Sequence, residues 1–400
     1  MNSLRGFVTS TSVISRLLQG KTCNISVRFL YNEQFLGLDK YIEGRQRTIS
    51  RIGNMRENFY NRMRAQLNTS LQSMIFTEDL KTVIHSAEDK PEDLELTVQM
   101  MKRFHKQNKE LRFGTFIFGP VAMRLFYYLK KQDTMCEFFK DPELDGFFDQ
   151  LKSYLLCMDL CFKNGEYDQI LHFFKDLQSK QIAETKFPRE AVVLTVGACY
   201  KLNTPETFQL ATDIVTQARE AKVPIIRKAL SFVVALALNQ GRADVALEIL
   251  SSIDRYNNIT GNNLKLMALA GLDRINDAFD ILRRVTDQDS PVQTRIRGEI
   301  CQSTLDALQQ SVDKLNDKET SHIFEQLCRS LKESNLVTSQ TIDDLVCLPI
   351  EPRQFLRDDG FAFRPRNRFP DQQFRPRESI ERDSDFPVRR RQFAGISDDY

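Results

Sequence analysis

The stretch "SYLLCMDLCFKNGEYDQILHFFKDLQSKQI", residues 153–182, contains two apolar segments separated by a turn with a glycine. Cys157 and Cys161 are four residues apart, so a helix would place both thiols on one face. His172 follows after the turn. These residues suit either part of a metal site or the packing surface of a helical hairpin, and the two alternatives indicate different classes of protein.

The same pattern recurs along the chain. At an offset of 38 residues the stretch aligns with residues 191–220, and at an offset of 76 it aligns with residues 229–258. Each unit reads as a helix, a turn with Gly or Asn, and a second amphipathic helix. Weaker units lie at 79–107, 118–141 and 262–285. Helical pairs repeated at this spacing predict an α-solenoid, in which each hairpin buries its apolar face against its neighbours.

The repeat also decides how the two cysteines are interpreted. Small or apolar residues occupy their positions in the next two units, and acidic residues occupy the position of the histidine. The equivalent residues are Thr195 and Val233 for Cys157, Cys199 and Ala237 for Cys161, and Asp213 and Glu248 for His172. A zinc site needs about four converging ligands, and the stretch supplies no others. The cysteines are therefore predicted to be packing residues, and neither a metal nor another cofactor is expected.

We predict an all-α protein, a right-handed α-solenoid of degenerate hairpins with disordered extensions at both ends. The predicted parts are a transit peptide (1–30), a basic helical segment (31–78), the helical repeats (79–286), a C-terminal helical segment (287–352) and a tail rich in Arg and Pro (353–400). No apolar run approaches the ~20 residues that a membrane-spanning helix needs. The eight scattered cysteines are typical of reduced thiols in an intracellular protein.

Charge is distributed unevenly along the chain. Residues 71–352 carry 34 basic and 41 acidic residues, whereas residues 41–70 hold six Arg and the tail holds eleven. The first 32 residues contain four basic residues, no acid, five Ser and three Thr, which is typical of a mitochondrial presequence. An ordinary flexible N-terminus is the alternative interpretation.

The hairpins resemble the pentatricopeptide-repeat family. Residues 153–182 and 229–258 align with its motif without a gap, and a tetratricopeptide repeat fits less well because its 34-residue period is not kept. The segments "FIFGPVAMRLFYYL" (116–129), "ACYKLNTPETF" (198–208) and "SFVVALALNQ" (231–240) are similar to mitochondrial members of the family. Over roughly residues 35–350, this resemblance implies a protein of the mitochondrial matrix that takes part in RNA maturation, and thereby in respiratory-chain assembly.

The resemblance also suggests candidate RNA contacts. In this family a side chain early in the first helix of each repeat helps to read one base. The equivalent residues here are Leu155, Val193, Ser231 and Asn263, and only Ser231 and Asn263 can hydrogen-bond a base. Basic side chains on the repeats add Arg124, Arg227 and Lys228 as candidate phosphate contacts, the alternative being a solvated helix face. Because two of the four positions are apolar, no target sequence is predicted.

The arginine-rich ends are further candidates. Residues 45–64 place six Arg near Phe59 and Tyr60, and the tail interleaves Arg with Phe. Such pairs suit phosphate contact and base stacking, worth ~1–3 kcal/mol per stacked base. The alternative for the tail is a solubilising extension of mixed charge.

Catalysis is not expected, because the chain has no GxxxxGK[ST], GxSxG or HExxH motif. We therefore expect an adaptor that binds single-stranded mitochondrial RNA while separate enzymes process it. The alternative is a protein–protein scaffold associated with the small subunit of the mitochondrial ribosome, without direct RNA contact. The negative charge of the repeats favours that alternative, since RNA affinity comes largely from Lys and Arg.

Overall fold

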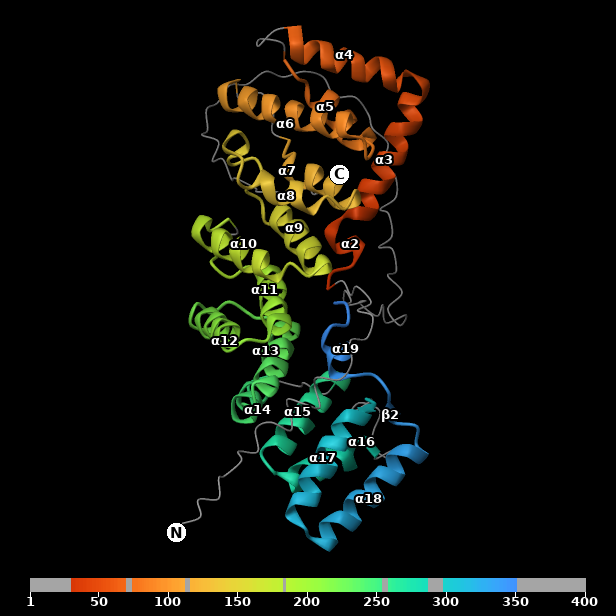
Figure 1. Ribbon diagram of the computed structural model, residues 1–400, viewed down its shortest axis with the longest axis vertical. Coiled ribbons are helices and arrows are strands. Elements are labelled where there is room, and N and C mark those ends of the chain that lie inside the picture. The colour runs from red at the N-terminus through yellow and green to blue at the C-terminus, as the bar shows by residue number, and fades with distance from the viewer. Residues whose placement is uncertain are drawn as a thin grey trace, which may run out of the picture. The chain divides into compact units, whose positions relative to one another are not determined.

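The computed structural model describes residues 30–69, 74–111, 116–182, 185–253, 258–286 and 298–350. The predicted presequence, except its last residue, and the predicted tail lie outside this range. The described chain is almost wholly α-helical, which confirms the predicted fold class (Figure 1). Its one sheet is a parallel pair of two-residue strands, β1 (Ile300–Cys301) and β2 (Val337–Thr338), which the sequence did not predict. No helix in this part of the chain is both long and apolar enough to cross a bilayer.

From Thr77 to Glu333 the helices form consecutive hairpins. Their bounds are α5 (Thr77–Ser86) with α6 (Pro91–Leu111), α7 (Gly119–Tyr128) with α8 (Gln132–Phe138), α9 (Leu151–Asn164) with α10 (Tyr167–Lys180), α11 (Arg189–Leu202) with α12 (Pro205–Glu220), α13 (Arg227–Asn239) with α14 (Ala243–Ser251), α15 (Ile259–Gly271) with α16 (Ile275–Thr286), and α17 (Gln302–Leu315) with α18 (Lys318–Glu333). A short 3-10 helix, η2 (Pro142–Leu144), precedes α9.

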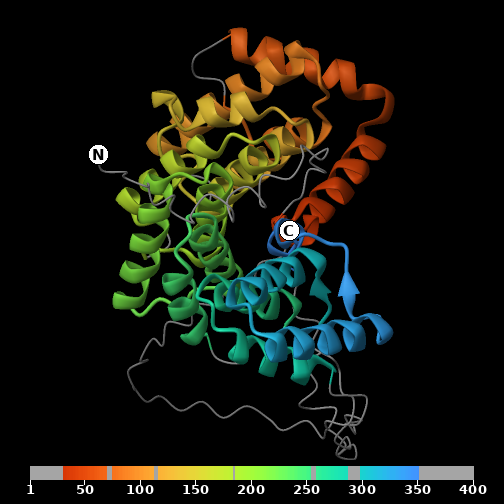
Figure 2. The same ribbon diagram turned by 60° about the horizontal axis from the view of Figure 1, so that its bottom comes forward.

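The hairpins stack in two layers. The first helices, from α5 to α17, contact one another in series, and we call them the first layer. Among the second helices, α10, α12 and α14 each contact both their own partner and the first helix of the next hairpin (Figures 1 and 2). Each hairpin thus buries its apolar face against the neighbouring hairpins, as expected for an α-solenoid.

Left-handed residues end the first helix of each central hairpin. Gly165, Asn203 and Gly241 have φ of 84°, 50° and 72°. These residues lie 38 positions apart, at the offset of the sequence repeat. Gly and Asn tolerate this backbone region better than other residues, so they stop the helix and reverse the chain. The turns that were recognised in the sequence are therefore the elements that set the period of the fold.

Three helices precede the hairpins and one follows them. They are α2 (Glu33–Leu36), α3 (Leu38–Ile52) and α4 (Arg56–Thr69), with the 3-10 helix η1 (Gly53–Met55) between α3 and α4, and the C-terminal helix α19 (Ile342–Val346). We call residues 30–52 the N-terminal cover and residues 341–350 the C-terminal cover. Helix α2 contacts α9, α3 contacts α5 and α7, and α19 contacts α13 and α15.

The two covers lie on the side of the first layer that faces away from α10, α12 and α14 (Figure 1). They meet where the backbone N–H of Ile350 donates to the carbonyl oxygen of Leu30 at 2.9 Å. Leu30 also approaches Gly197 of α11, where an added Cβ would lie 3.4 Å from the Leu30 side chain. First-layer helices are therefore enclosed by neighbours, partners and covers, which explains why α11 and α13 are apolar on all sides.

Candidate nucleic-acid interface

The four positions suggested for base readout lie inside the protein. Leu155 and Ser231 are 2% exposed, and Val193 and Asn263 are fully buried. Each lies near the start of a first-layer helix, on a layer that the covers and the neighbouring helices enclose. The apolar character of Leu155 and Val193, which departs from the family's reading pattern, is explained by this burial.

Asn263 forms a structural bridge rather than a base-reading group. Its side-chain amide donates to the carbonyls of Ile259 at 2.8 Å and Glu299 at 3.0 Å. Its Oδ1 accepts from the backbone N–H of Cys301 at 2.8 Å and from the hydroxyl of Thr304 at 3.0 Å. Both donors and both lone pairs are thus used inside the protein, which corrects the expectation that Asn263 faces RNA.

Ser231 is also turned inward. Its hydroxyl donates to the carbonyl oxygen of Arg227, one helical turn earlier, at 3.0 Å. Back-bonding of this kind is common for a buried serine in a helix. Because Ser231 is buried in α13, it cannot reach a base in this arrangement, and its predicted role is corrected in the same way as that of Asn263.

Arg124 holds the N-terminal cover in place. Its Nε donates to the carbonyl oxygen of Leu36 at 3.0 Å, and the Lys152 ammonium donates to that of Phe35 at 2.8 Å. These carbonyls belong to the last turn of α2, where a helix has no acceptor partners of its own and attracts cations. Desolvation lowers the pKa of Arg124. This predicted phosphate contact is therefore used within the protein.

Lys228 has the matching role at the C-terminal cover. Its ammonium donates to the carbonyl oxygen of Leu345 in α19 at 3.3 Å, and Lys201 pairs with Asp343 at 2.7 Å. Burial lowers the pKa of Lys228 to about 8. The two neighbours Arg227 and Lys228 therefore differ: Lys228 is partly buried beneath α19, whereas Arg227 is exposed.

Most arginines of residues 45–64 also have partners inside the chain. Arg45 is buried and donates to the carbonyl oxygen of His85 at 3.2 Å, and Arg56 forms a close ion pair with Asp93. The ring of Tyr60, expected to stack on bases, is 1% exposed. Other basic side chains of the repeats pair as well: Lys102 with Asp141 and Glu143, Lys131 with Asp89, and Arg283 with Asp280.

One set of exposed cations lies on two successive loops between hairpins, and only one of its members was predicted from the sequence. Lys186, Arg189, Lys222 and Arg227 lie in the α10–α11 and α12–α13 loops or in the first position of the helix that follows. None has an ion pair with another described residue. Arg189 and Arg227 are 38 residues apart, so the repeat offset was a signal that could have identified Arg189. We call these four residues the basic loop edge.

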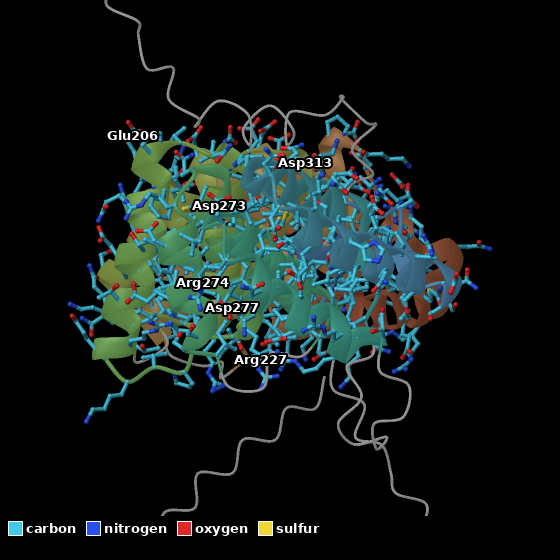
Figure 3. All side chains as sticks on the ribbon, turned by 90° about the horizontal axis from the view of Figure 1, so that it is seen from below. Glu206, Arg227, Asp273, Arg274, Asp277 and Asp313 are labelled. Atoms are coloured by element: carbon cyan, nitrogen blue, oxygen red, sulfur yellow. The ribbon has the colours of Figure 1, made fainter. Side chains whose placement is uncertain are left out.

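The two loops of this edge flank a hollow of about 400 Å³. It is lined by Gln181, Thr185, Lys186, Phe187, Ala221 and Val223. The opposite edge, formed by the turns inside the hairpins, carries exposed acidic residues such as Glu206 and Asp273. Viewed from below, Glu206 and Arg227 lie on opposite sides (Figure 3). The turn edge also carries the exposed cations Arg242 and Arg274, but these pair with Asp244 and Asp277, whereas the cations of the basic loop edge have no ion pair with another described residue.

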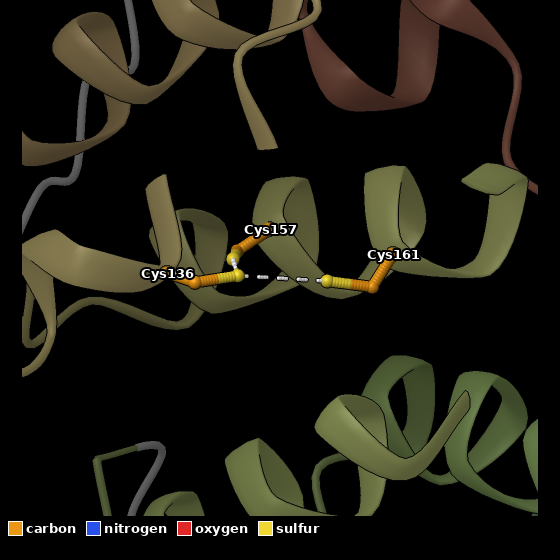
Figure 4. A group of neighbouring side chains, drawn as sticks. All are labelled: Cys136, Cys157 and Cys161. Carbon is orange, nitrogen blue, oxygen red and sulfur yellow. Dashed lines mark hydrogen bonds between the residues drawn. The ribbon is translucent and has the colours of Figure 1, made fainter. Parts of the chain in front are cut away.

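A third thiol joins the cysteine pair that the sequence singled out. Cys157 and Cys161 lie on one face of α9, as expected, and Cys136 of α8 approaches both (Figure 4). The Cys136 sulfur is 3.8 Å from that of Cys157 and 3.9 Å from that of Cys161. A further candidate ligand is therefore present, contrary to the expectation from the sequence. Residue spacing alone does not show that α8 packs against α9.

No family model matches the chain. It is similar to proteins named "Pentatricopeptide repeat-containing protein 2, mitochondrial". The relative from Mus musculus is 27% identical over 80% of this chain and 82% of its own length. The relative from Xenopus laevis is 25% identical over 80% of this chain and 81% of its own length. The relative from Danio rerio is 26% identical over 82% of this chain and 84% of its own length. The resemblance suggested by the sequence is confirmed.

Proposed function

We propose that this protein is a non-catalytic, RNA-binding adaptor of mitochondria that takes part in the processing or maturation of mitochondrial mRNA, and thereby supports respiratory-chain function. Single-stranded RNA would bind along the basic loop edge. The observation that carries the proposal is the group of four exposed cations, without ion pairs to described residues, on two successive repeats. Such a row can displace counterions from consecutive phosphates, which is the main source of affinity for a nucleic acid backbone.

This mode of binding differs from reading one base per repeat. The readout positions are buried inside the protein, so recognition would depend on phosphates and on whatever base enters the hollow beside Phe187. Backbone contacts position a nucleic acid but carry little sequence information. We therefore expect modest sequence preference and a strong dependence on salt. RNA-processing enzymes would supply the chemistry and, together with the mitochondrial small ribosomal subunit, are the expected partners.

The proposed location is the mitochondrial matrix. The basic, acid-free start of the chain and the relatives' names support import. Leu30 is fully buried and accepts a hydrogen bond from Ile350, so removal of Leu30 would disturb the contact between the covers. We therefore expect cleavage of the presequence before Leu30 rather than after it.

The test is a charge reversal at equivalent positions of two repeats. The variant Arg189→Glu/Arg227→Glu of the chain from Leu30 is compared with wild type for binding to a fluorescent single-stranded RNA at several salt concentrations. We expect affinity to fall about tenfold or more at low salt, and the slope of log affinity against log salt to decrease by ~0.7 for each phosphate that the variant no longer neutralises.

The matched control is Lys175→Glu/Lys265→Glu. Both lysines are exposed, lie on α10 and α15 away from the two loops, and have no ion pair with a described residue. This control changes net charge by the same amount. An equal loss in both variants would contradict the basic loop edge as the binding site and indicate a general charge effect. Absence of binding by folded wild type would contradict RNA binding itself.

The scaffold alternative keeps one specific observation in its favour, the occlusion of the first layer. Other segments of the same chain cover the positions that would read bases. The first layer is therefore used for contacts with protein, as in a scaffold, rather than with RNA bases. Co-sedimentation with the small ribosomal subunit that survives RNase treatment, and that is unchanged in Arg189→Glu/Arg227→Glu, would support the scaffold. Loss of co-sedimentation on RNase treatment would support the adaptor.

A further inference from the structure

Three thiols converge in the core between α8 and α9. Cys157 and Cys161 are fully buried, and Cys136 is 5% exposed. Their sulfur atoms all lie within 4.8 Å of one another, with Cys136 at 3.8 and 3.9 Å from the other two (Figure 4). This is the one group of three or more Cys, His, Asp or Glu side chains with such convergence among the described residues.

The spacing fits metal coordination. An equilateral triangle with sides of 3.9 Å has its centre ~2.3 Å from each corner, which is the usual bond length from a thiolate to zinc. The sulfurs are too far apart for a disulfide, which requires ~2.05 Å. A metal ion at the centre of the triangle would therefore need only small movements of the side chains, because the third edge is no longer than 4.8 Å.

The repeat shows that packing alone does not require these thiols. The next two hairpins fill the position of Cys157 with Thr195 and Val233, and the third fills the position of Cys161 with Ala237. Cys199 occupies the Cys161 position in the α11–α12 hairpin, where the described residues form no group of three metal-ligating side chains. The same architecture thus accepts other residues, and among the described residues three thiols gather only at the junction of the α7–α8 and α9–α10 hairpins.

We propose that Cys136, Cys157 and Cys161 bind one thiophilic d10 metal ion between α8 and α9, with Cu(I) as the preferred ion. Three sulfur ligands without a fourth suit a three-coordinate soft ion, whereas Zn²⁺ in a structural site takes four ligands. The ion would join the short helix α8 of one hairpin to α9 of the next and thereby stabilise the packing of these two hairpins.

Binding requires loss of protons from the thiols. The S–H groups of Cys157 and Cys161 can both point at the sulfur of Cys136, and this lowers the pKa of Cys136, whereas burial raises that of Cys157. Cys136 contacts both other sulfurs and is therefore the central member of the group. Lys140 acts on it as a nearby cation and favours the thiolate. Uptake of the metal should release protons and become tighter as pH rises.

The experiment uses the reduced chain from Leu30, without oxygen. Cu(I) is titrated against a chromophoric Cu(I) chelator, and in a second arm Zn²⁺ is titrated against a chromophoric zinc chelator. We expect one equivalent of Cu(I) per chain, three sulfur neighbours by X-ray absorption, and weaker uptake of Zn²⁺. Tighter Zn²⁺ than Cu(I) would keep the site but overturn the choice of ion.

The variant Cys161→Ala removes a ligand. It introduces alanine, which the repeat already accepts at the equivalent position, Ala237. Affinity should fall at least about 100-fold, since loss of the hydrogen bonds around a metal's ligands alone costs 10–100-fold. Cys136→Ser should behave in the same way, and Cys199→Ser is the matched control that keeps full uptake. Equal uptake by all four proteins would overturn the proposal. Equally, a wild-type chain that takes up neither ion, or that only forms a disulfide, would overturn it.

Discussion

The central hairpins and the covers are held by contacts of different range. In α9–α14 the main contacts join helices that are adjacent or two apart along the chain. In the covers they join distant residues: the hydroxyl of Tyr31 donates to the carbonyl oxygen of Glu190, 159 residues away, and Lys228 donates to Leu345, 117 residues away. The contacts between the central helices recur with the sequence repeat, whereas the contacts of the covers do not. A solenoid can therefore gain a new surface from terminal segments without any change in its repeat.

The difference has a consequence for the basic residues of the repeats. At each cover two cations are used to hold helix ends or acids, Arg124 and Lys152 at α2, and Lys201 and Lys228 at α19. Such cations are partly removed from solvent and cannot also contact phosphate. The four residues of the basic loop edge lie in or next to the loops between hairpins and have no ion pair with another described residue, so their cations stay exposed.

The largest expected effect comes from the central hairpins. Phe232 of α13 is fully buried between α11 and its neighbours, in contact with Tyr200. The substitution Phe232→Ala should reduce the free energy of unfolding by about 3–5 kcal/mol, because it removes apolar contact and leaves a cavity. Urea denaturation followed by circular dichroism measures it. Phe76→Ala is the control, since Phe76 is 57% exposed, and similar losses in both variants would contradict the assigned core.

A smaller and local effect is expected at the C-terminal cover. Leu345 of α19 is 1% exposed, so Leu345→Ala should weaken docking of this helix by about 2–3 kcal/mol. Hydrogen exchange should speed up in residues 341–350 while α11 and α13 stay protected, because a five-residue helix can open without the rest. Leu348→Ala, at a 40% exposed position, is the control. Faster exchange throughout the repeats would instead show that the cover belongs to the same cooperative unit.

The contrast between the regions also explains which features could be predicted. The hairpins, their turns and the all-α fold followed from the 38-residue offset, which aligns Leu156 with Leu194 and Phe232, and from the Gly and Asn residues that end the first helices. The covers could not be predicted, because nothing in the sequence of residues 341–350 indicates that they dock on α13. For the same reason Asn263 and Ser231 were expected to face RNA, although tertiary contacts bury both.

The local sequence identified Arg227 and the Cys157–Cys161 pair as candidate site residues. It did not identify the other members of the two sites. Arg189 was overlooked although it shares the repeat offset with Arg227, so that information was present in the sequence. Cys136 is 21 residues from Cys157 and on a different helix. Its place beside the pair depends on how α8 packs on α9, which spacing alone does not determine.

The smallest expected effect is a pH dependence of the C-terminal cover. Because Lys228 has a pKa of about 8 when docked and ~10.4 when exposed to water, the unfolded chain binds more protons than the folded chain between these values. Stability should then rise with pH through this window, and the cost of burying the charged lysine is fully present below pH 8. Cys347 has the opposite influence at higher pH, because its pKa is raised to about 11 by burial.

The measurement compares the melting temperatures of wild type and Lys228→Met from pH 7 to pH 9. Methionine keeps an apolar stem against Phe232 but does not titrate, while Cys347 and the Lys201–Asp343 pair are common to both proteins. We expect the melting temperature of wild type to rise relative to that of the variant by about 2 °C over this range. A constant difference between the two proteins would show that Lys228 keeps an ordinary pKa. Its contact with Leu345 would then be exposed to water, and the C-terminal cover would be held by apolar packing, the Lys201–Asp343 pair and the hydrogen bond from Ile350 to Leu30.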